Sequence, residues 1–395
     1  MTINIIRGQN QIGGSIIEVK SDTTRLILDA GLELDDTDAE APEVEGLFQG
    51  KPSCDAVLIS HYHGDHIGLL EKVLPGIPIY MGAGAFSVSN AARGYLGKPL
   101  YEADGFFESG KPFVIGDITV TPYLCDHSAF DSYMIYLSCK GKTALYTGDF
   151  RANGRKSFSS LLHRLPHADT LITEGTTLTR ERGENRTEAD LELDAVKAIQ
   201  GTDAPVFVLM AATNIDRIVT MYKAARKTGR IFAQDLYMAT VACAAGGSIP
   251  NPKSFTDVRA FMTFGGDKRY AQLQEFREKK IGRAGIARSK FVMCVRPSMR
   301  SYLEKLSDEL PFDGGIMFYS MWEGYRQKED VAEFLLFMKA KGVTVLPLHT
   351  SGHADAATID SLVRHVAPIT IIPVHTENAA WFDRYNSENE SEVNI

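Results

Sequence analysis

Four side chains of the types that bind metal ions lie within six residues of one another: His61, His63, Asp65 and His66. They directly follow the apolar run 56–60, and Gly64 is expected to let the chain turn tightly enough for them to converge. Neutral imidazole and carboxylate ligands suit Zn²⁺ or Mn²⁺, and a ligand set without thiolates favours a catalytic site over a closed structural one. The segment therefore predicts a catalytic metal site at the end of a strand.

Three further residues of metal-ligand type each come after a predicted strand: His127, Asp149 and His375. Any one of them alone would more often be a surface residue or satisfy the core. Together with the first cluster they complete two metal sites, and a carboxylate such as Asp149 could bridge two cations. Two cations would help to deprotonate a shared water near neutral pH and would neutralise charge that builds on the attacked group. The set predicts a hydrolase.

The elements that must position these residues divide the chain into two styles. Up to about residue 175, short apolar runs alternate with Gly, Asp and Pro turns, as in β-rich proteins. The predicted strands are Ser15–Val19, Arg25–Asp29, Ala56–Ser60, Ile118–Val120 and Thr143–Thr147. The strand at Ile118–Val120 is expected to continue through Thr119–Leu124.

Beyond Glu174 helical and strand patterns alternate, which is typical of an α/β module. The predicted order is a helix at Thr187–Gln200, a strand at Pro205–Ala211, a helix at Asn214–Thr228 and a strand at Ile231–Ala233. The end of the chain returns to the first style, with a strand at Val343–Leu346, a helical stripe from Ile359 to Val366 and a last strand at Ile369–Val374. We therefore expect residues 1–180 and 346–395 to form one domain and residues 181–345 to be inserted, because His375 must reach the cluster at His61.

Composition fits a globular protein with a sizeable core. The chain has 395 residues, of which 44% are hydrophobic and 23% charged. No run approaches the ~18 apolar residues that cross a bilayer, and the first residues lack the features of a signal peptide. Five scattered cysteines without a CxxC pair fit a reducing cytosol, so a cytoplasmic location without membrane association is expected.

The net charge of −8 argues weakly against a nucleic-acid enzyme. An acidic protein does not attract nucleic acid as a whole, so phosphates would have to be held by a local basic groove or by the metals. Five or six basic residues in one cleft would suffice, and charge therefore does not decide the question.

The motifs resemble those of the metallo-β-lactamase superfamily. The resemblance implies an α/β fold, a four-layer αββα sandwich. It also implies that His61, His63 and His127 hold one metal, that Asp65, His66 and His375 hold the other, and that Asp149 bridges the two. The implied cofactors are two divalent metal ions, with Zn²⁺ expected and Mn²⁺ as the alternative.

Three further segments are similar to the β-CASP nuclease branch of this superfamily, in particular to ribonuclease J. They are 171–177 with the carboxylate of Glu174, 349–354 with His353, and 371–377 with His375. Segments 213–217 and 320–325 also resemble the family's inserted domain, so that the resemblance spans nearly the whole chain. It implies an inserted β-CASP α/β domain and RNA as the substrate, and it leaves a homo-oligomer open.

The chemistry of these residues agrees with such a role. His353 on a Ser-Gly-His turn could sit near the metals without binding one and protonate a leaving alkoxide, while Glu174 could orient its imidazole. We therefore predict Asp65, His353 and Glu174 as catalytic residues. Glu174 could instead only cap a turn. Ser351 could bind a phosphate or merely form the turn, and Asn214 is a substrate-binding candidate whose presence is explained equally well by a helix N-cap.

The sequence thus predicts a metal-dependent hydrolase, a ribonuclease that cleaves RNA phosphodiester bonds within the strand or from the 5′ end. One alternative is a small-molecule hydrolase for a lactone, a thioester or a cyclic nucleotide on the same fold. The pairing of His353 with Glu174 distinguishes the two, because simple esterases do not need it. A second alternative is a catalytically silent scaffold, against which the intact set of ligands argues.

Overall fold

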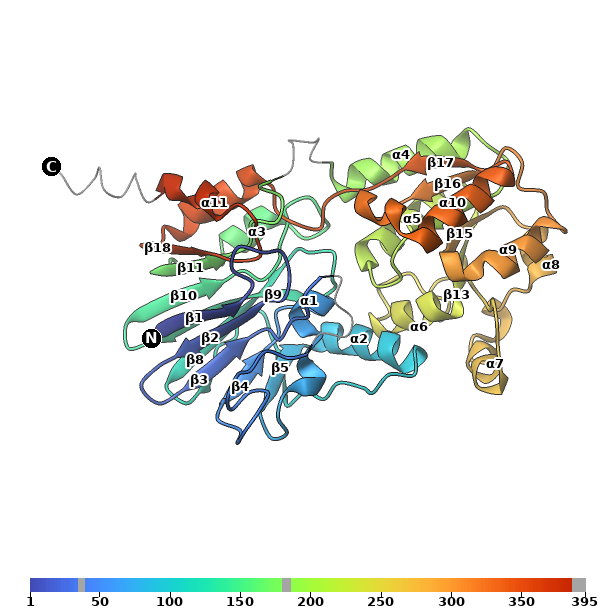
Figure 1. The fold of residues 1–395 in the computed structure, drawn as a ribbon. Helices are drawn as coiled ribbons and strands as arrows, with labels where there is room; N and C mark the ends of the chain where they lie inside the picture. Colours follow the sequence, from blue (N-terminus) through green and yellow to red (C-terminus); the bar gives the residue numbers. More distant parts are fainter. Residues whose placement is uncertain (35–39, 180–185, 386–395) are drawn as a thin grey trace. The chain divides into compact units, whose positions relative to one another are not determined.

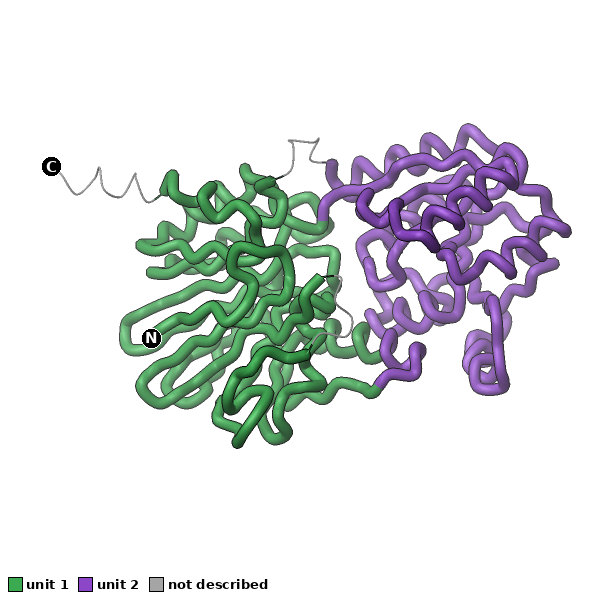
Figure 2. The backbone as a smooth tube through the Cα atoms, in the orientation of Figure 1, with its two compact units in different colours: residues 1–90, 99–185, 352–395 green, residues 91–98, 186–351 purple. Residues whose placement is uncertain are grey.

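The computed structural model describes residues 1–34, 40–179 and 186–385 and divides the chain into two compact units (Figure 2). Unit 1 consists of residues 1–90, 99–185 and 352–395, and unit 2 of residues 91–98 and 186–351. The predicted boundary at residues 180–181 lies outside the described residues. The short segment 91–98, at the end of a helix, groups with unit 2, which the sequence patterns did not indicate.

The first sheet of unit 1 has the strand order β1-β2-β3-β4-β5-β6 (Figure 1). Strands β1 to β3 pair antiparallel, and β3 to β6 pair parallel. The bounds are β1 (Thr2–Arg7), β2 (Ile16–Lys20), β3 (Arg25–Leu28), β4 (Ala56–Leu58), β5 (Ile79–Gly82) and β6 (Gly105–Phe107).

The second sheet has the order β18-β11-β10-β9-β8-β7. Its strands are β7 (Phe113–Ile115), β8 (Ile118–Cys125), β9 (Ser132–Cys139), β10 (Lys142–Tyr146), β11 (Thr170–Thr173) and β18 (Thr370–Pro373). The last strand pairs in parallel with β11, with Thr370 opposite Thr170. The end of the chain therefore lies in the same sheet as residues 113–173.

The two sheets face each other across one hydrophobic core. Ile17, Leu28 and Leu58 of the first sheet pack with Ile135 and Ile172 of the second. A second cluster packs helices against the other side of the second sheet, through residues of α3 (Phe158–Leu162) and α11 (Ala356–Val366). On the first sheet, β4 leads into α1 (Gly64–Ile67) and η1 (Leu70–Lys72), and β5 leads into α2 (Ala83–Tyr95). This layered arrangement is the α/β fold that the sequence predicts.

Unit 2 is built on a six-stranded parallel sheet with the order β14-β13-β15-β12-β16-β17. Its strands are β12 (Val206–Leu209), β13 (Ile231–Asp235), β14 (Val258–Phe261), β15 (Phe291–Val295), β16 (Ile316–Tyr319) and β17 (Thr344–Pro347). β12 and β15 are buried throughout, as central parallel strands are.

Helices connect these strands, which confirms the predicted strand–helix–strand pattern. They are α4 (Glu188–Gln200), α5 (Ile215–Lys227), α6 (Leu236–Ala244), α7 (Asp267–Gln274), α8 (Arg283–Ala287), α9 (Arg300–Ser307) and α10 (Glu329–Ala340), with 3₁₀ turns η2 (Arg277–Lys279), η3 (Pro297–Met299) and η4 (Glu323–Gln327); η5 (Ala379–Phe382) follows β18 in unit 1.

Local side-chain caps fix where several helices begin. Thr187 and Asp190 form a reciprocal capping box at α4, and Asn214 accepts a hydrogen bond from the Arg217 N–H at the start of α5. Asp355 caps α11 in the same way through Thr358. None of the helices in the described part of the chain is long and apolar enough to cross a membrane.

Candidate metal centre

The predicted ligands stand at strand ends on unit 1, as expected for side chains that must meet at one edge of a sandwich. β4 ends at Leu58, and α1 begins at Gly64. Gly64 has no left-handed backbone, and no atom lies within 4 Å of a Cβ added there. The expected role of Gly64 in a tight turn is therefore not found. Asp65 and His66 are presented by the ordinary helical turn α1, and His61 and His63 by the loop that leads into it.

Glycine is required at Gly148 instead, one residue before Asp149. Its φ is +51°, and a Cβ there would lie 2.7 Å from Cβ of Ser60. The absence of a side chain lets the strand end approach the segment that carries His61, which brings Asp149 into the cluster.

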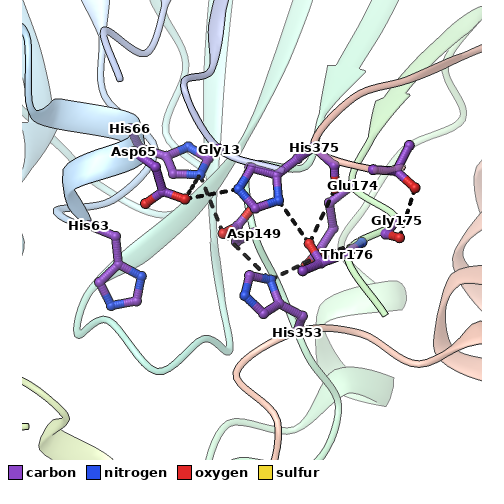
Figure 3. A network of polar contacts seen from close by, with 12 residues as sticks. Gly13, His63, Asp65, His66, Asp149, Glu174, Gly175, Thr176, His353 and His375 are labelled. Carbon is purple, nitrogen blue, oxygen red and sulfur yellow. Dashed lines mark hydrogen bonds and ion pairs between the residues drawn. The ribbon is translucent and has the colours of Figure 1, made fainter. Parts of the chain in front are cut away.

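The structure brings all seven predicted ligands together in groups whose potential ligand atoms lie within 4.8 Å of one another. One group consists of His61, His63 and His127, and the other of Asp65, His66, Asp149 and His375. Asp149 is also grouped with Glu174, His353 and His375. Figure 3 shows Asp149 between His66 and His353, with His375 beside Asp65.

Short distances within these groups show which atoms face one another. Nε2 of His127 lies 3.0 Å from Nδ1 of His63. Nε2 of His375 lies 3.0 Å from Oδ2 of Asp65, and Nε2 of His66 lies 3.3 Å from Oδ2 of Asp149. Ring nitrogens and carboxylate oxygens thus converge on one another.

Several of these atoms are buried and form no hydrogen bond of good geometry among the described residues, although Nε2 of His66 lies close to the carboxylate of Asp149. They are Nε2 of His61, Nε2 of His66, and both carboxylate oxygens of Asp149. Such a buried atom normally costs about 1–3 kcal/mol if it stays unsatisfied. Divalent cations between the groups would satisfy all four atoms at once. The residues present therefore fit a metal centre of imidazole and carboxylate ligands.

Asp29 holds two of the histidines by their other ring nitrogens. Its carboxylate accepts hydrogen bonds from Nδ1 of His66 (2.8 Å), from the hydroxyl and backbone N–H of Ser60 (both 2.7 Å) and from the hydroxyl of Tyr146 (2.7 Å). Because the Ser60 hydroxyl donates to Asp29, it accepts from Nδ1 of His61 at 3.0 Å. Both imidazoles are thereby held with Nε2 toward the centre.

The same arrangement recurs at the other two buried imidazoles. Nδ1 of His127 donates to the carbonyl of Gly352 at 2.5 Å. Nδ1 of His375 lies 2.8 Å from the hydroxyl of Thr176, which itself donates to Glu174. All four imidazoles therefore keep Nε2 as the nitrogen available to a cation.

The sequence analysis did not identify Asp29 or Thr176. Asp29 is fully buried with a φ of 60°, and His375 has a φ of 50°. Left-handed backbone at non-glycine residues is strained and tends to occur at functional sites. A signal for Asp29 existed, because an acidic residue directly after the apolar strand Arg25–Leu28 stands at the same sheet edge as the cluster after β4.

Burial and neighbouring charges set the protonation of the cluster before any metal binds. Burial lowers the pKa of His63 to about 4 and, together with neighbouring imidazoles, holds the pKa values of His61 and His127 well below the usual range. These imidazoles are neutral at neutral pH, which is the form that binds metals.

His66 and Asp149 behave as an ion pair. Burial opposes the charge on His66, but the carboxylates of Asp149 and Asp65 raise its pKa well above the usual value. Burial likewise opposes ionisation of Asp149, yet His375, His66 and His353 hold the pKa of this carboxyl well below its usual range. A cation would replace the proton on His66, and the negative charge of Asp149 is already present to receive it.

His353 and Glu174 lie at the edge of the cluster. Glu174 is fully buried, and Nδ1 of His353 is 3.1 Å from its Oε2 and 3.5 Å from Oδ2 of Asp149. The backbone N–H of Phe150 and the hydroxyl of Thr176 also donate to Glu174. The geometry agrees with the predicted pairing, and Glu174 does more than cap a turn.

The remaining predicted residues are less defined by the structure. Ser351 is half-buried in the loop after β17, and Asn214 caps α5. Their roles toward a substrate stay predictions. All five cysteines are free, and burial raises the pKa of Cys54 and of Cys125, as expected for small buried side chains. Cys125 contacts the backbone oxygen of Asp149, whereas Cys54 is near the cluster in sequence and has Arg25 and Glu18 as its charged neighbours.

Two family models match the chain. The model of the metallo-beta-lactamase superfamily matches residues 11–193, and that of the Zn-dependent metallo-hydrolase RNA specificity domain matches residues 339–395. The first range contains the cluster from His61 to Glu174, and the second contains His353 and His375.

Curated relatives include ribonuclease J of Sinorhizobium meliloti, which is 21% identical over 366 residues, covering 88% of this chain and 62% of the relative. Ribonuclease J of Thermus thermophilus is 25% identical over 257 residues, covering 58% of this chain and 43% of the relative. The chain thus spans less than two thirds of the length of these relatives. A crystal structure of a protein of unknown function from Enterococcus faecalis V583 has the same fold, with a TM-score of 0.78, 20% identity, and coverage of 95% of this chain and 94% of that one.

Proposed function

We propose that this chain, a ribonuclease J-like member of the metallo-β-lactamase superfamily, is a metal-dependent ribonuclease. The reaction is hydrolysis of RNA phosphodiester bonds, either within the strand or from its 5′ end. We propose the substrate as a chemical class, RNA, and not as a particular physiological RNA. The relatives that bear the name ribonuclease J are longer than this chain.

One observation carries this proposal. A half-buried imidazole, His353, lies within hydrogen-bond distance of the buried carboxylate of Glu174 and 3.5 Å from the metal-ligand candidate Asp149. The leaving group of RNA hydrolysis is a poor alkoxide, which benefits from a proton donor beside the metals. The match of the RNA specificity model to the segment that carries His353 supports the same reading.

In this proposal His61, His63 and His127 hold one divalent cation, Asp65, His66 and His375 hold the other, and Asp149 is shared. Bound cations supply a lowered pKa for an attacking water and offset the negative charge that builds on the phosphate. Zn²⁺ is the expected metal because imidazole dominates the set, and Mn²⁺ is the alternative. We assign Asp65 both proposed roles, metal ligand and catalytic carboxylate; the ligand role is supported by its Oδ2, which lies 3.0 Å from Nε2 of His375.

The other residues orient groups and move protons. Glu174 accepts a hydrogen bond from Nδ1 of His353. Nε2 is then the ring nitrogen that donates a proton to the departing alkoxide. The Thr176 hydroxyl accepts a hydrogen bond from Nδ1 of His375 and donates one to the carboxylate of Glu174. Ser351 is proposed to contact a phosphate oxygen from the loop that leads to His353.

The proposal is tested by incubating the purified protein with 5′-labelled RNA and DNA oligomers and, in parallel, with a panel of lactones, thioesters and cyclic nucleotides. Cleavage of RNA that needs a divalent metal is the expected result, and the product ladder distinguishes cutting within the strand from removal of 5′ nucleotides. Efficient hydrolysis of a small ester without RNA cleavage would support the small-molecule alternative. No hydrolysis of any substrate with both metals bound would support a silent scaffold.

Location and assembly complete the proposal. We place the protein in the cytoplasm, because five free cysteines suit a reducing compartment. A homo-oligomer is compatible with the chain, and sedimentation of the purified protein would define the assembly.

A further inference from the structure

A hollow of about 450 Å³ lies in unit 2 and is independent of the metal centre. It is lined by residues 94–97 at the end of α2 and by residues 264–269 and Gln272 around the start of α7. Its volume is in the range of pockets that hold small organic groups. The lining combines aromatic rings, cations and glycines.

An arginine holds two aromatic rings in place at this hollow. The guanidinium of Arg269 lies 4.5 Å from the ring centre of Tyr95 and 4.5 Å from that of Phe264, and it donates a hydrogen bond to the Tyr95 hydroxyl at 3.2 Å. The ring of Tyr95 also packs against Tyr237, with 5.0 Å between ring centres. The rings are therefore fixed on a rigid base.

Phe264 is the outer member of this stack and is 53% exposed. A phenylalanine that is held by a cation on one side and exposed elsewhere offers a flat surface for a planar ligand. Such a platform suits a nucleobase, because every base has a π face that stacks on an aromatic ring without regard to sequence.

Positive charge and open backbone accompany the platform. Lys268 and Arg269 outweigh Asp267 among the lining residues. Gly266 precedes α7 and has no side chain that could accept hydrogen bonds from the first backbone N–H groups of the helix. N–H groups at the start of a helix favour an anion. In sequence, the segment 253–290 that carries these residues contains ten lysines and arginines against four acidic residues, a net charge of +6 in a chain whose net charge is −8. Two of these cations, Arg283 and Lys290, pair with Glu309 and Asp203 outside the segment.

We propose that this hollow is a contact site for single-stranded RNA on unit 2. A base stacks on Phe264, while Lys268 and the N–H groups at the start of α7 contact the adjacent phosphates. Charge complementarity favours RNA as the partner. Segment 253–290 is positively charged in a chain that is negatively charged overall, and a positively charged segment attracts a polyanion. The inference rests on the proposed ribonuclease function and adds to it a place where the substrate is held.

Binding is measured by fluorescence anisotropy with a labelled oligouridylate of about 20 nucleotides, made resistant to hydrolysis by phosphorothioate linkages. Phe264→Ala is expected to raise Kd about tenfold, because stacking on one aromatic side chain contributes a factor of this order. Lys268→Gln should raise Kd less and lower the slope of log Kd against log salt by about one. Thermal melting of each variant checks that unit 2 remains folded.

Two matched variants on unit 2 serve as controls. Leu336→Ala removes an apolar side chain that is 66% exposed on α10, and Lys305→Gln removes an exposed lysine on α9. Both should bind RNA as the unmodified protein does. Equal affinity of Phe264→Ala and the unmodified protein, equal losses in the controls, or no RNA binding by the unmodified protein would overturn the inference. The two proposals can fail separately. If the unmodified protein binds RNA but never cleaves it, and Phe264→Ala loses this binding, the inference is upheld and the proposed function is refuted.

Discussion

Nδ1 of His353 lies 3.1 Å from Oε2 of Glu174, although 179 residues separate the two in the chain. The same carboxylate accepts the hydroxyl proton of Thr176 at 2.6 Å, and that hydroxyl contacts Nδ1 of His375. Glu174 thus joins the proposed proton donor to one of the proposed metal ligands. Nδ1 of each imidazole donates into this network, which leaves Nε2 of His375 for a cation. In the proposed role His353 carries a proton on both ring nitrogens and donates the one on Nε2 to the leaving alkoxide.

His353→Ala should keep both metals and the fold while losing a factor of ~10²–10⁴ in the rate of RNA cleavage, the usual worth of general-acid catalysis. Bis-nitrophenyl phosphate has a leaving group that needs no proton, so the same variant should lose much less on it. Rates on both substrates, together with metal analysis, provide the measurement. Equal losses on both would indicate lost positioning or lost metal, and no loss on RNA would remove the main reason to prefer a nuclease.

Metal content should approach two divalent ions per chain in carefully purified protein, because seven ligands converge at the centre. His63→Ala and Asp149→Asn should each lose metal and activity together, and a chelator should abolish activity that added Zn²⁺ or Mn²⁺ restores. His163→Ala is the matched control, since this histidine is exposed and contacts only the backbone oxygen of Ser159 among the interactions described. Full activity in either ligand variant would contradict the assignment.

Asp29→Asn should weaken metal binding by about 10–100-fold without removing any metal ligand. An amide cannot accept at both positions. Its N–H₂ group would face either the backbone N–H of Ser60 at the Oδ1 position or the three donors at the Oδ2 position, from His66, the Ser60 hydroxyl and Tyr146. Unfolding free energy should fall by about 1–3 kcal/mol. Competition titration with a chromogenic chelator measures the affinity, and urea unfolding measures the stability.

A matched control for this variant is Asp169→Asn. Asp169 accepts the backbone N–H and hydroxyl of Thr143 at the start of β10, away from the predicted ligands. This change should reduce stability and leave metal affinity unaltered. If both variants had the same metal affinity, Asp29 would have only a structural role.

Asn214→Ala should lower the free energy of unfolding by about 0.5–2 kcal/mol, because it removes the N-cap of α5. Asn214→Ser keeps a capping oxygen and should change stability by only a few tenths of a kcal/mol. We expect the serine variant to keep KM for RNA. A raised KM with unchanged stability would instead identify Asn214 as a substrate contact.

The sequence by itself determined the kind of chemistry and the local elements. His61 to His66 follow β4 within a few residues, so their types, their spacing and the preceding strand are local properties that a pattern can reveal. The same holds for the helix that begins after Thr187 and for the one capped by Asn214, because capping and periodicity act over three or four residues. The α/β fold followed from these patterns and from the resemblance.

Only the tertiary structure decided how each side chain is oriented. Asp29 contacts His66 across 37 residues, and Gly352 contacts His127 across 225. Which ring nitrogen faces the centre depends on these partners, and no local pattern specifies a partner so far along the chain. The assignment of residues 91–98 to unit 2 is of the same kind, because it depends on where the end of α2 packs, as the stack of Tyr95 on Arg269 illustrates. Residue types determine which ions the cluster could hold, and long-range packing determines which atoms face the place where an ion would lie.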